Sequence, residues 1–208
     1  MTTAIEPLGP ATQVATGPTG TAQVALTFHG QGDITIAREI LQIAADKQAH
    51  ITVMVVGIWL NQYPGVAREI LSGGHELGNH TWSHTNFQAL PEDQMLQEVI
   101  KCRDALLRHA GTPGDYFRPS RTQYATDQTR RVAGRAGYRT VLSYDVDSLD
   151  FTEPGGPAVR ANVRAAKAGA IVSMHLGYRS TVAALPGILD DLAARGLSAV
   201  TAGTLLRD

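Results

Sequence analysis

Two histidines stand four residues apart in the stretch from Gly78 to His84, which reads Gly-Asn-His-Thr-Trp-Ser-His. If this stretch is helical, positions i and i+4 fall on one face, so the rings of His80 and His84 can reach one ion. Neutral imidazole nitrogen is a good ligand for borderline divalent metals such as zinc. The pair alone is a weak signal, because two surface histidines often arise at this spacing by chance.

Four further polar clusters each follow an apolar run that has the length and composition of a strand. These clusters are His29–Asp33, Arg118–Arg121, Asp145–Phe151 and His175–Gly177. In a barrel of parallel strands and helices, the residues at the carboxyl ends of the strands meet around one mouth. The sequence therefore predicts one site that combines metal ligands with acid–base groups.

In this order, the five clusters resemble the motif set of the polysaccharide deacetylases of the NodB-homology type, carbohydrate esterase family 4. The resemblance covers about residues 23–206, and the segment around His80 and His84 is its most specific part. Arg118-Pro119 resembles the third motif, Asp147–Phe151 the fourth with Phe in place of the usual Trp, and Met174-His175 the fifth. The resemblance implies metal-dependent removal of N- or O-acetyl groups from a carbohydrate, on a distorted barrel of about seven parallel strands.

The first motif departs from the family pattern. Its usual form, Thr-Phe-Asp-Asp-Gly, supplies a base and a metal ligand, but here Thr27-Phe28 is followed by His29 and Gly30. The nearest carboxylate is Asp33, and the two glycines before it would let the loop fold back. We expect Asp33 as the third metal ligand and His29 as the base. Two alternatives stay open: the reverse assignment, with Asp33 as base or orienter, and a degraded metal site.

The resemblance also implies roles for the other strand-end clusters. We expect His175 to be the general acid, with Asp147 or Asp150 fixing its tautomer. Arg118 would hold a carboxylate or a substrate oxygen through its bidentate fork. A backbone N–H at or near Tyr124 would help to stabilise the oxyanion.

The expected ligands of the site are one divalent metal ion and an acetylated carbohydrate. Zinc is the first choice, with cobalt, nickel and manganese as alternatives. Arg121 stands where the family often has a small residue or Tyr, so it would narrow or charge the substrate groove. The expected substrate-binding residues are Arg121, Tyr124 and Phe151. Two rival functions remain: a carbohydrate-binding pseudoenzyme, and a hydrolase of another, cyclic amide that works without a metal.

Composition indicates an ordinary globular domain and excludes several partner classes. With 208 residues, 43% of them hydrophobic, the chain suits a single core. Its net charge of −1 gives no electrostatic case for binding nucleic acid or an anionic membrane. The single cysteine, Cys102, excludes an intramolecular disulfide, and no apolar run approaches the ~20 residues of a membrane span. We expect a monomer.

The first twenty residues differ in composition from the rest. They are rich in Thr, Gly and Pro and lack the basic start and apolar stretch of a signal peptide. We therefore expect a flexible arm or linker at 1–20 and the deacetylase domain at 21–208. The resemblance implies an extracellular or cell-envelope location, which no export signal in this chain supports.

Strand-like and helix-like segments alternate along the chain. The run Ile51–Val56 has the β-branched character of a buried strand, and Ser198–Val200 is the last short apolar run. This alternation predicts βα units and a parallel sheet, and the resemblance favours barrel closure. Helices are expected at 34–49, 59–71, 91–109, 126–136, 158–168 and 182–195.

Overall fold

The computed structural model describes residues 8–207, and its strands alternate with helices along the chain. The strands are β1 (Thr12–Val14), β2 (Gln23–Gly30), β3 (Thr52–Val55), β4 (Glu76–Asn79), β5 (Tyr116–Phe117), β6 (Thr140–Leu142), β7 (Val146–Asp147), β8 (Ile171–His175) and β9 (Ser198–Val200). The α-helices are α1 (Ile34–Asp46), α2 (Gly57–Gln62), α3 (Val66–Ser72), α4 (Glu92–Ala110), α5 (Asp127–Arg135), α6 (Gly156–Val163), α7 (Arg179–Ala194) and α8 (Ala202–Leu205).

The nine strands in the described part of the chain form one sheet. Its order is β1-β6-β5-β4-β3-β2-β8-β7, with β9 paired to β2, and every strand pair is parallel. The predicted α/β fold with a distorted barrel of parallel strands is confirmed, although the sheet has more than the seven strands expected. Because all strands point the same way, their carboxyl ends share one edge.

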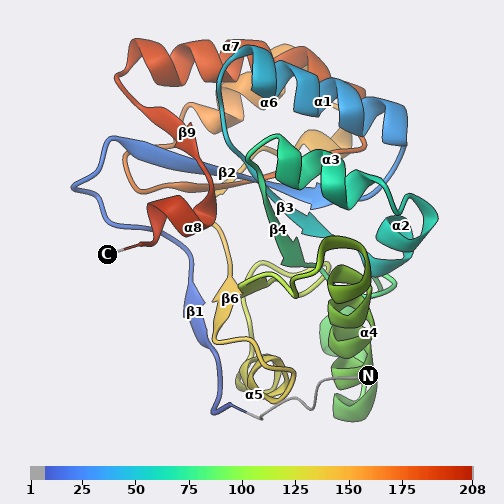
Figure 1. The fold of residues 1–208 in the computed structure, drawn as a ribbon. Helices are drawn as coiled ribbons and strands as arrows, with labels where there is room; N and C mark the ends of the chain where they lie inside the picture. The colour runs from blue at the N-terminus through green and yellow to red at the C-terminus, as the bar shows by residue number, and fades with distance from the viewer. Residues whose placement is uncertain (1–7, 208) are drawn as a thin grey trace.

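The helices pack on the outside of the curved sheet (Figure 1). Helices α1, α6 and α7 lie together over the β2 side, whereas α4 and α5 lie near β6 on the other side. The largest core cluster joins α1, α3 and α7 to the sheet, and a second fills the space between α4, α5 and β5–β6. A third small cluster, which includes Met54, Ile171 and Leu205, lies between the sheet and α8.

The amino-terminal segment is partly ordered. Residues 12–14 form β1, which pairs in parallel with β6, and Ala11 is buried in the second core cluster. The flexible arm predicted at 1–20 therefore contains an edge strand of the sheet, while its first seven residues lie outside the described part. Composition missed this strand because a three-residue edge strand needs little apolar sequence.

One predicted helix is wrong in its extent. The expected helix at 59–71 is two helices, α2 and α3, separated at Tyr63-Pro64-Gly65. Proline disfavours helical backbone in the residue before it, and Tyr63 ends α2 with non-helical dihedrals. The other expected helices are present with shifts of a few residues at their ends. Within residues 8–207, no helix has the length and apolar character needed to cross a membrane.

Candidate active site

The polar clusters predicted from the sequence do meet at the carboxyl edge of the sheet. His29 is the penultimate residue of β2 and His175 is the last residue of β8, and the two are register partners on adjacent strands. His80 follows β4 directly, and Arg118 follows β5. All four side chains are buried.

The segment that holds His80 and His84 is a loop and not the helix expected. Thr81 and His84 have left-handed backbone conformations, with φ of 68° and 56°. The Asn79 side chain fixes this turn, since its Oδ1 accepts from the Thr81 backbone N–H at 2.9 Å and its Nδ2 donates to Val99 O at 2.9 Å. The turn brings the His80 and His84 ring centroids to 5.0 Å. The turn, and not helix periodicity, therefore brings the two histidines together.

Three histidines form the set that could hold a metal ion. One nitrogen from each of His29, His80 and His84 lies within 4.8 Å of the others. His80 Nδ1 donates to the carbonyl oxygen of Arg118 at 2.9 Å, which leaves Nε2 as the unprotonated nitrogen. That Nε2 is buried and has no hydrogen-bond partner among residues 8–207. An orphaned buried lone pair is costly, so its position among three imidazoles fits a metal ligand.

A chain of hydrogen bonds fixes the protons of the other two imidazoles. Arg118 can only donate, so its contact with His29 Nε2 at 3.2 Å makes that nitrogen an acceptor. His29 Nδ1 must then carry the proton and donate to His175 Nε2 at 2.9 Å. His175 in turn donates from Nδ1 to Asp150 Oδ1 at 2.7 Å. In this chain of hydrogen bonds, His29 and His175 each carry one ring proton, which is the neutral form.

Burial keeps the metal-capable imidazoles neutral at physiological pH. The pKa values of His29 and His80 lie well below the ordinary 6.5, chiefly because burial penalises the charged form and secondarily because neighbouring cationic groups repel it. Burial, with contributions from Arg121 and His175, lowers the pKa of His84 to about 4. Neutral rings are the form that binds a metal.

Arg118 has a different role from the one expected. It is fully buried, and its guanidinium donates to Leu142 O at 2.8 Å, to Thr27 Oγ1 at 2.9 Å and to Ser143 O. Burial lowers its pKa to about 10, so it stays charged at neutral pH. One N–H of its Nη1 contacts His29 Nε2, so among the described residues Arg118 holds an imidazole and no carboxylate.

The geometry does not support Asp33 as the third ligand. Its carboxylate caps α1, accepting from the backbone N–H of Thr35 at 2.7 Å, and this bond lowers the pKa of Asp33. The altered first motif also leaves no space for the missing carboxylate. A Cβ atom added to Gly30 would lie 2.9 Å from Val53 Cγ1, closer than real Cβ atoms approach.

Two replacements of Asp33 distinguish a role as the N-cap of α1 from a role as a metal ligand. Asp33→Ala should lower the thermal midpoint by about 2–4 °C, as expected for loss of an N-cap in a domain of this size. Asp33→Asn should retain both the midpoint and the metal content, because an amide oxygen caps nearly as well. Thr126→Ala removes the comparable N-cap of α5 and is the control for the effect of losing a helix cap on the thermal midpoint. A loss of metal in Asp33→Asn would show that Asp33 ligates after all.

Of the two carboxylates predicted to orient His175, the structure places Asp150 against it. Asp150 is fully buried and accepts from His175 through both backbone N–H and Nδ1, and from Thr181 Oγ1 at 2.6 Å. Asp147 accepts from the backbone N–H of Leu149 and faces the pocket instead. Burial with three donors fixes Asp150 in the orientation that holds the His175 tautomer.

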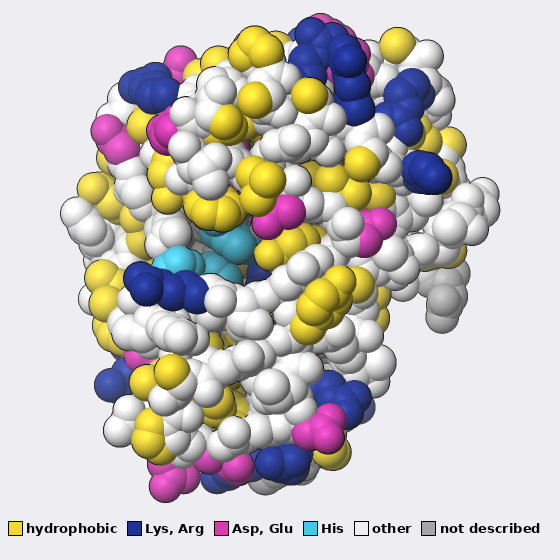
Figure 2. Space-filling model, turned by 180° about the vertical axis from the view of Figure 1, so that it is seen from behind, with side chains coloured by type: hydrophobic (Ala, Val, Ile, Leu, Met, Phe, Trp, Pro, Cys, Tyr) yellow, Lys and Arg dark blue, Asp and Glu magenta, His cyan; other side chains and the backbone are white. Residues whose placement is uncertain are grey.

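A pocket of about 370 Å³ opens beside His29, His84 and His175. Figure 2 shows histidine side chains at the bottom of a hollow on this face of the molecule, with a basic side chain at its rim. Predicted residues Arg121 and Phe151 line the pocket, and the Phe151 ring centroid lies 5.5 Å from that of His175. Tyr124 is exposed and is not among the lining residues.

Sequence reasoning missed several lining residues. Tyr178 places its ring centroid 5.5 Å from that of His175, and Gln31, Tyr144 and Ser173 also face the pocket. Gln31, Tyr144 and Tyr178 lie within three residues after a strand, so proximity to a strand end was the available signal.

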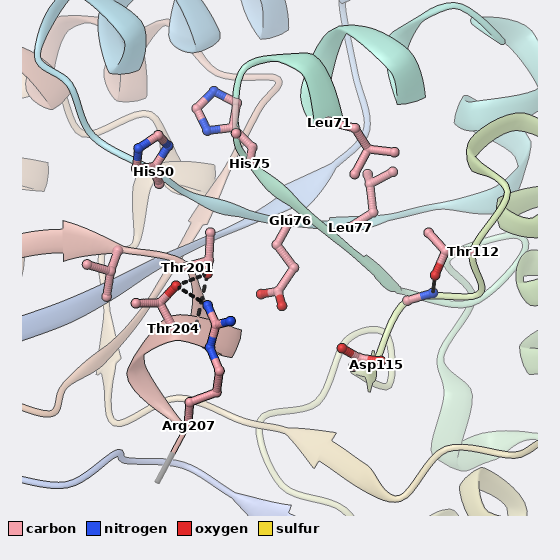
Figure 3. A pocket seen from close by; sticks show the side chains of 13 residues that line it. His50, Leu71, His75, Glu76, Leu77, Thr112, Asp115, Thr201, Thr204 and Arg207 are labelled. Carbon is pink, nitrogen blue, oxygen red and sulfur yellow. Dashed lines mark hydrogen bonds between the residues drawn. The ribbon is translucent and has the colours of Figure 1, made fainter.

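A second pocket, of about 380 Å³, lies at the opposite ends of the strands (Figure 3). The Glu76 carboxylate points into it and accepts from Thr52 Oγ1 at 2.7 Å and from the Gly203 backbone N–H at 3.1 Å. His75 Nδ1 accepts from the Ile51 backbone N–H. The Gly203 contact attaches α8 to β4, and the other two contacts join the starts of β3 and β4, so we assign this pocket a structural role.

Comparison with known proteins agrees with the fold and identifies the family. The polysaccharide deacetylase family profile matches residues 16–141. The chain is 31% identical over 189 residues to a peptidoglycan-N-acetylglucosamine deacetylase of Bacillus cereus, with 88% of each chain covered. The chain therefore belongs to the polysaccharide deacetylase family.

Other relatives extend this picture. A chitooligosaccharide deacetylase of a Bradyrhizobium species is 28% identical over 168 residues, covering 76% of this chain and 73% of the relative. A crystal structure of a peptidoglycan N-acetylglucosamine deacetylase superimposes with a TM-score of 0.86 at 26% identity, covering 93% and 92% of the two chains. A pseudoenzyme of carbohydrate esterase family 4 from Bacillus anthracis has the same fold, with a TM-score of 0.87 at 24% identity over 96% and 70%.

Proposed function

We propose that this protein is a metal-dependent hydrolase that removes acetyl groups from an N- or O-acetylated glycan. The observation that carries the proposal is the unpartnered, buried Nε2 of His80, which lies in a group of three neutral imidazoles beside a pocket. The curated relatives named as peptidoglycan and chitooligosaccharide deacetylases support an acetylated glycan as the substrate class.

The donor set is suited to zinc. Three imidazoles with one position left for water or substrate occur in catalytic zinc sites, and imidazole also accepts cobalt or nickel. We therefore assign His29, His80 and His84 as the ligands, in place of the Asp33 set expected from the sequence. For His29 this assignment requires the Nε2 lone pair to leave its contact with Arg118. When bound, the ion would polarise the acyl oxygen and lower the pKa of a water molecule.

The remaining residues orient and move protons. Asp150 holds the Nδ1 proton of His175, so Nε2 is the atom that can take a proton and return it to the leaving amine or alcohol. In the structure, His175 Nε2 accepts a hydrogen bond from the Nδ1–H of His29. A substrate must displace this contact before His175 can serve it. Arg118 contacts His29 and is therefore a positioning residue. Phe151 and Tyr178 place aromatic rings beside His175, where the acyl group would lie.

The decisive experiment measures zinc content and acetate release on the same preparation. We expect about one zinc per chain and release of acetate from chitooligosaccharide or peptidoglycan fragments, lost on chelation and regained on zinc addition. The test refutes the proposal if zinc binds stoichiometrically and no acetate is released from chitooligosaccharide, peptidoglycan or acetylxylan.

One specific observation favours a second candidate, a glycan-binding pseudoenzyme. Gly30 stands where the family motif has its second Asp, and Val53 closes the space that its side chain would need. In addition, the lone pair of His29 Nε2 is already engaged by Arg118. If this candidate is correct, the chain binds oligosaccharide with or without zinc and releases no acetate.

A further inference from the structure

The pocket beside the three histidines has one cationic side chain without a partner. Arg121 and Asp147 are the only Arg, Lys, Asp or Glu residues among the described residues that line it. Within residues 8–207, Arg121 forms neither an ion pair nor a side-chain hydrogen bond. Most other exposed pocket groups are aromatic, amide or hydroxyl side chains, so Arg121 dominates the charge on its side of the pocket.

Arg121 is held at the rim by its backbone. Its φ of 57° lies in the left-handed region, which is uncommon for a residue with a Cβ atom. Flanking hydrogen bonds maintain this conformation: Ser120 Oγ donates to Thr85 O at 2.5 Å, and Ser143 Oγ donates to Gln123 O at 2.5 Å. The loop is therefore fixed, while the guanidinium at its tip is exposed to solvent.

The two charges face the pocket from different sides. Arg121 is close enough to His84 to contribute to its lowered pKa. Asp147 lies on β7, where its register partner is Ser173 on β8, and its contact is the backbone N–H of Leu149. The pocket thus combines the Arg121 cation, which lies near His84, with the Asp147 carboxylate, which can accept hydrogen bonds from hydroxyl groups.

We propose that Arg121 selects a glycan that carries a carboxylate on the sugar adjoining the acetylated one. A guanidinium binds a carboxylate through two parallel hydrogen bonds, and its planar fork adds directional preference. This inference rests on the proposed function for the location of the acetylated sugar, and it goes further by naming an acidic substrate class. An exposed ion pair is worth little, so the preference should be moderate.

The test compares binding of matched neutral and acidic oligosaccharides by calorimetry, with acetate measured in the same samples. The tetrasaccharide pair is chitotetraose and a hyaluronan tetrasaccharide with uronic carboxylates. The disaccharide pair is chitobiose and an N-acetylglucosamine–N-acetylmuramic acid disaccharide with a lactyl carboxylate. The wild-type chain should bind at least one acidic probe about 3- to 10-fold more tightly than its neutral partner of the same length, and added salt should reduce the difference.

Variants attribute the preference to one side chain. Arg121→Gln should bind the neutral and acidic probes equally, and Arg121→Lys should keep part of the preference because it keeps the charge without the fork. Both replacements are unbranched at Cβ, so the backbone strain is unchanged. Arg68→Gln, which removes an exposed arginine on α3 outside the pocket lining, should leave the preference intact.

The possible outcomes separate this inference from the proposed function. Equal binding of all probes by the wild type, or an unchanged preference in Arg121→Gln, would overturn the role of Arg121 even if acetate is released. Selective binding that depends on Arg121, without acetate release from any probe, would support this inference and overturn the deacetylase proposal.

Discussion

His175→Ala should lower the turnover of an N-acetylated oligosaccharide by about 10²–10⁴-fold at fixed zinc occupancy. The amine is a poor leaving group unless it is protonated. His175 lines the pocket, and its Nε2 is the nitrogen without a proton because Asp150 holds the proton on Nδ1. The loss should be smaller on an activated phenyl acetate, whose leaving group needs little protonation. Initial rates of acetate release from both substrates, for wild type and variant, give the comparison.

The carboxylates provide the controls for this prediction. Asp150→Asn should also reduce turnover, because it no longer fixes the His175 tautomer, although it keeps the side-chain volume. Asp147→Asn should cost much less, since Asp147 contacts Leu149 and not His175. Equal losses on both substrates in His175→Ala would mean that His175 shapes the pocket and that the acid is another group.

Replacing His80 and His84 together by Ala should reduce zinc from about one per chain to near zero. The two side chains supply two of the three imidazoles, and a site reduced to His29 alone has no chelating geometry. Metal content after dialysis against a weak chelator measures the effect, and circular dichroism verifies that the fold is retained.

Two further variants test which residue is the third ligand. His29→Gln should weaken zinc binding, whereas His109→Gln should not, because His109 is a half-buried residue on α4 that contacts Asn61 and is outside the group of three histidines. Zinc retained at one per chain in the double variant would place the metal elsewhere. Zinc binding unaffected by His29→Gln would return His29 to the role of base that the sequence suggested.

Much of the fold and the composition of the site could be predicted from the sequence, because both depend on local patterns. Alternating apolar runs and helical periodicity predict parallel βα units, and polar residues after strands are brought to one edge by the common direction of the strands. His80, His84 and His175 could be singled out for this reason. The order of these clusters was specific enough to indicate the family.

The individual roles depend on contacts that only the folded chain brings together. Asp33 has two local options, capping a helix or turning toward a metal, and the position of α1 decides for the cap. Asp147 and Asp150 are equivalent in the sequence, but only Asp150 is buried against His175. Arg118 is an ordinary strand-end residue in the sequence, and only its burial brings one of its N–H groups against His29. The order of residues along the chain is enough to say which chemical groups gather at the mouth of the barrel, because parallel strands bring their ends to one edge. Which ring nitrogen carries each proton, and which is left for a metal, depends on contacts between residues far apart in the sequence.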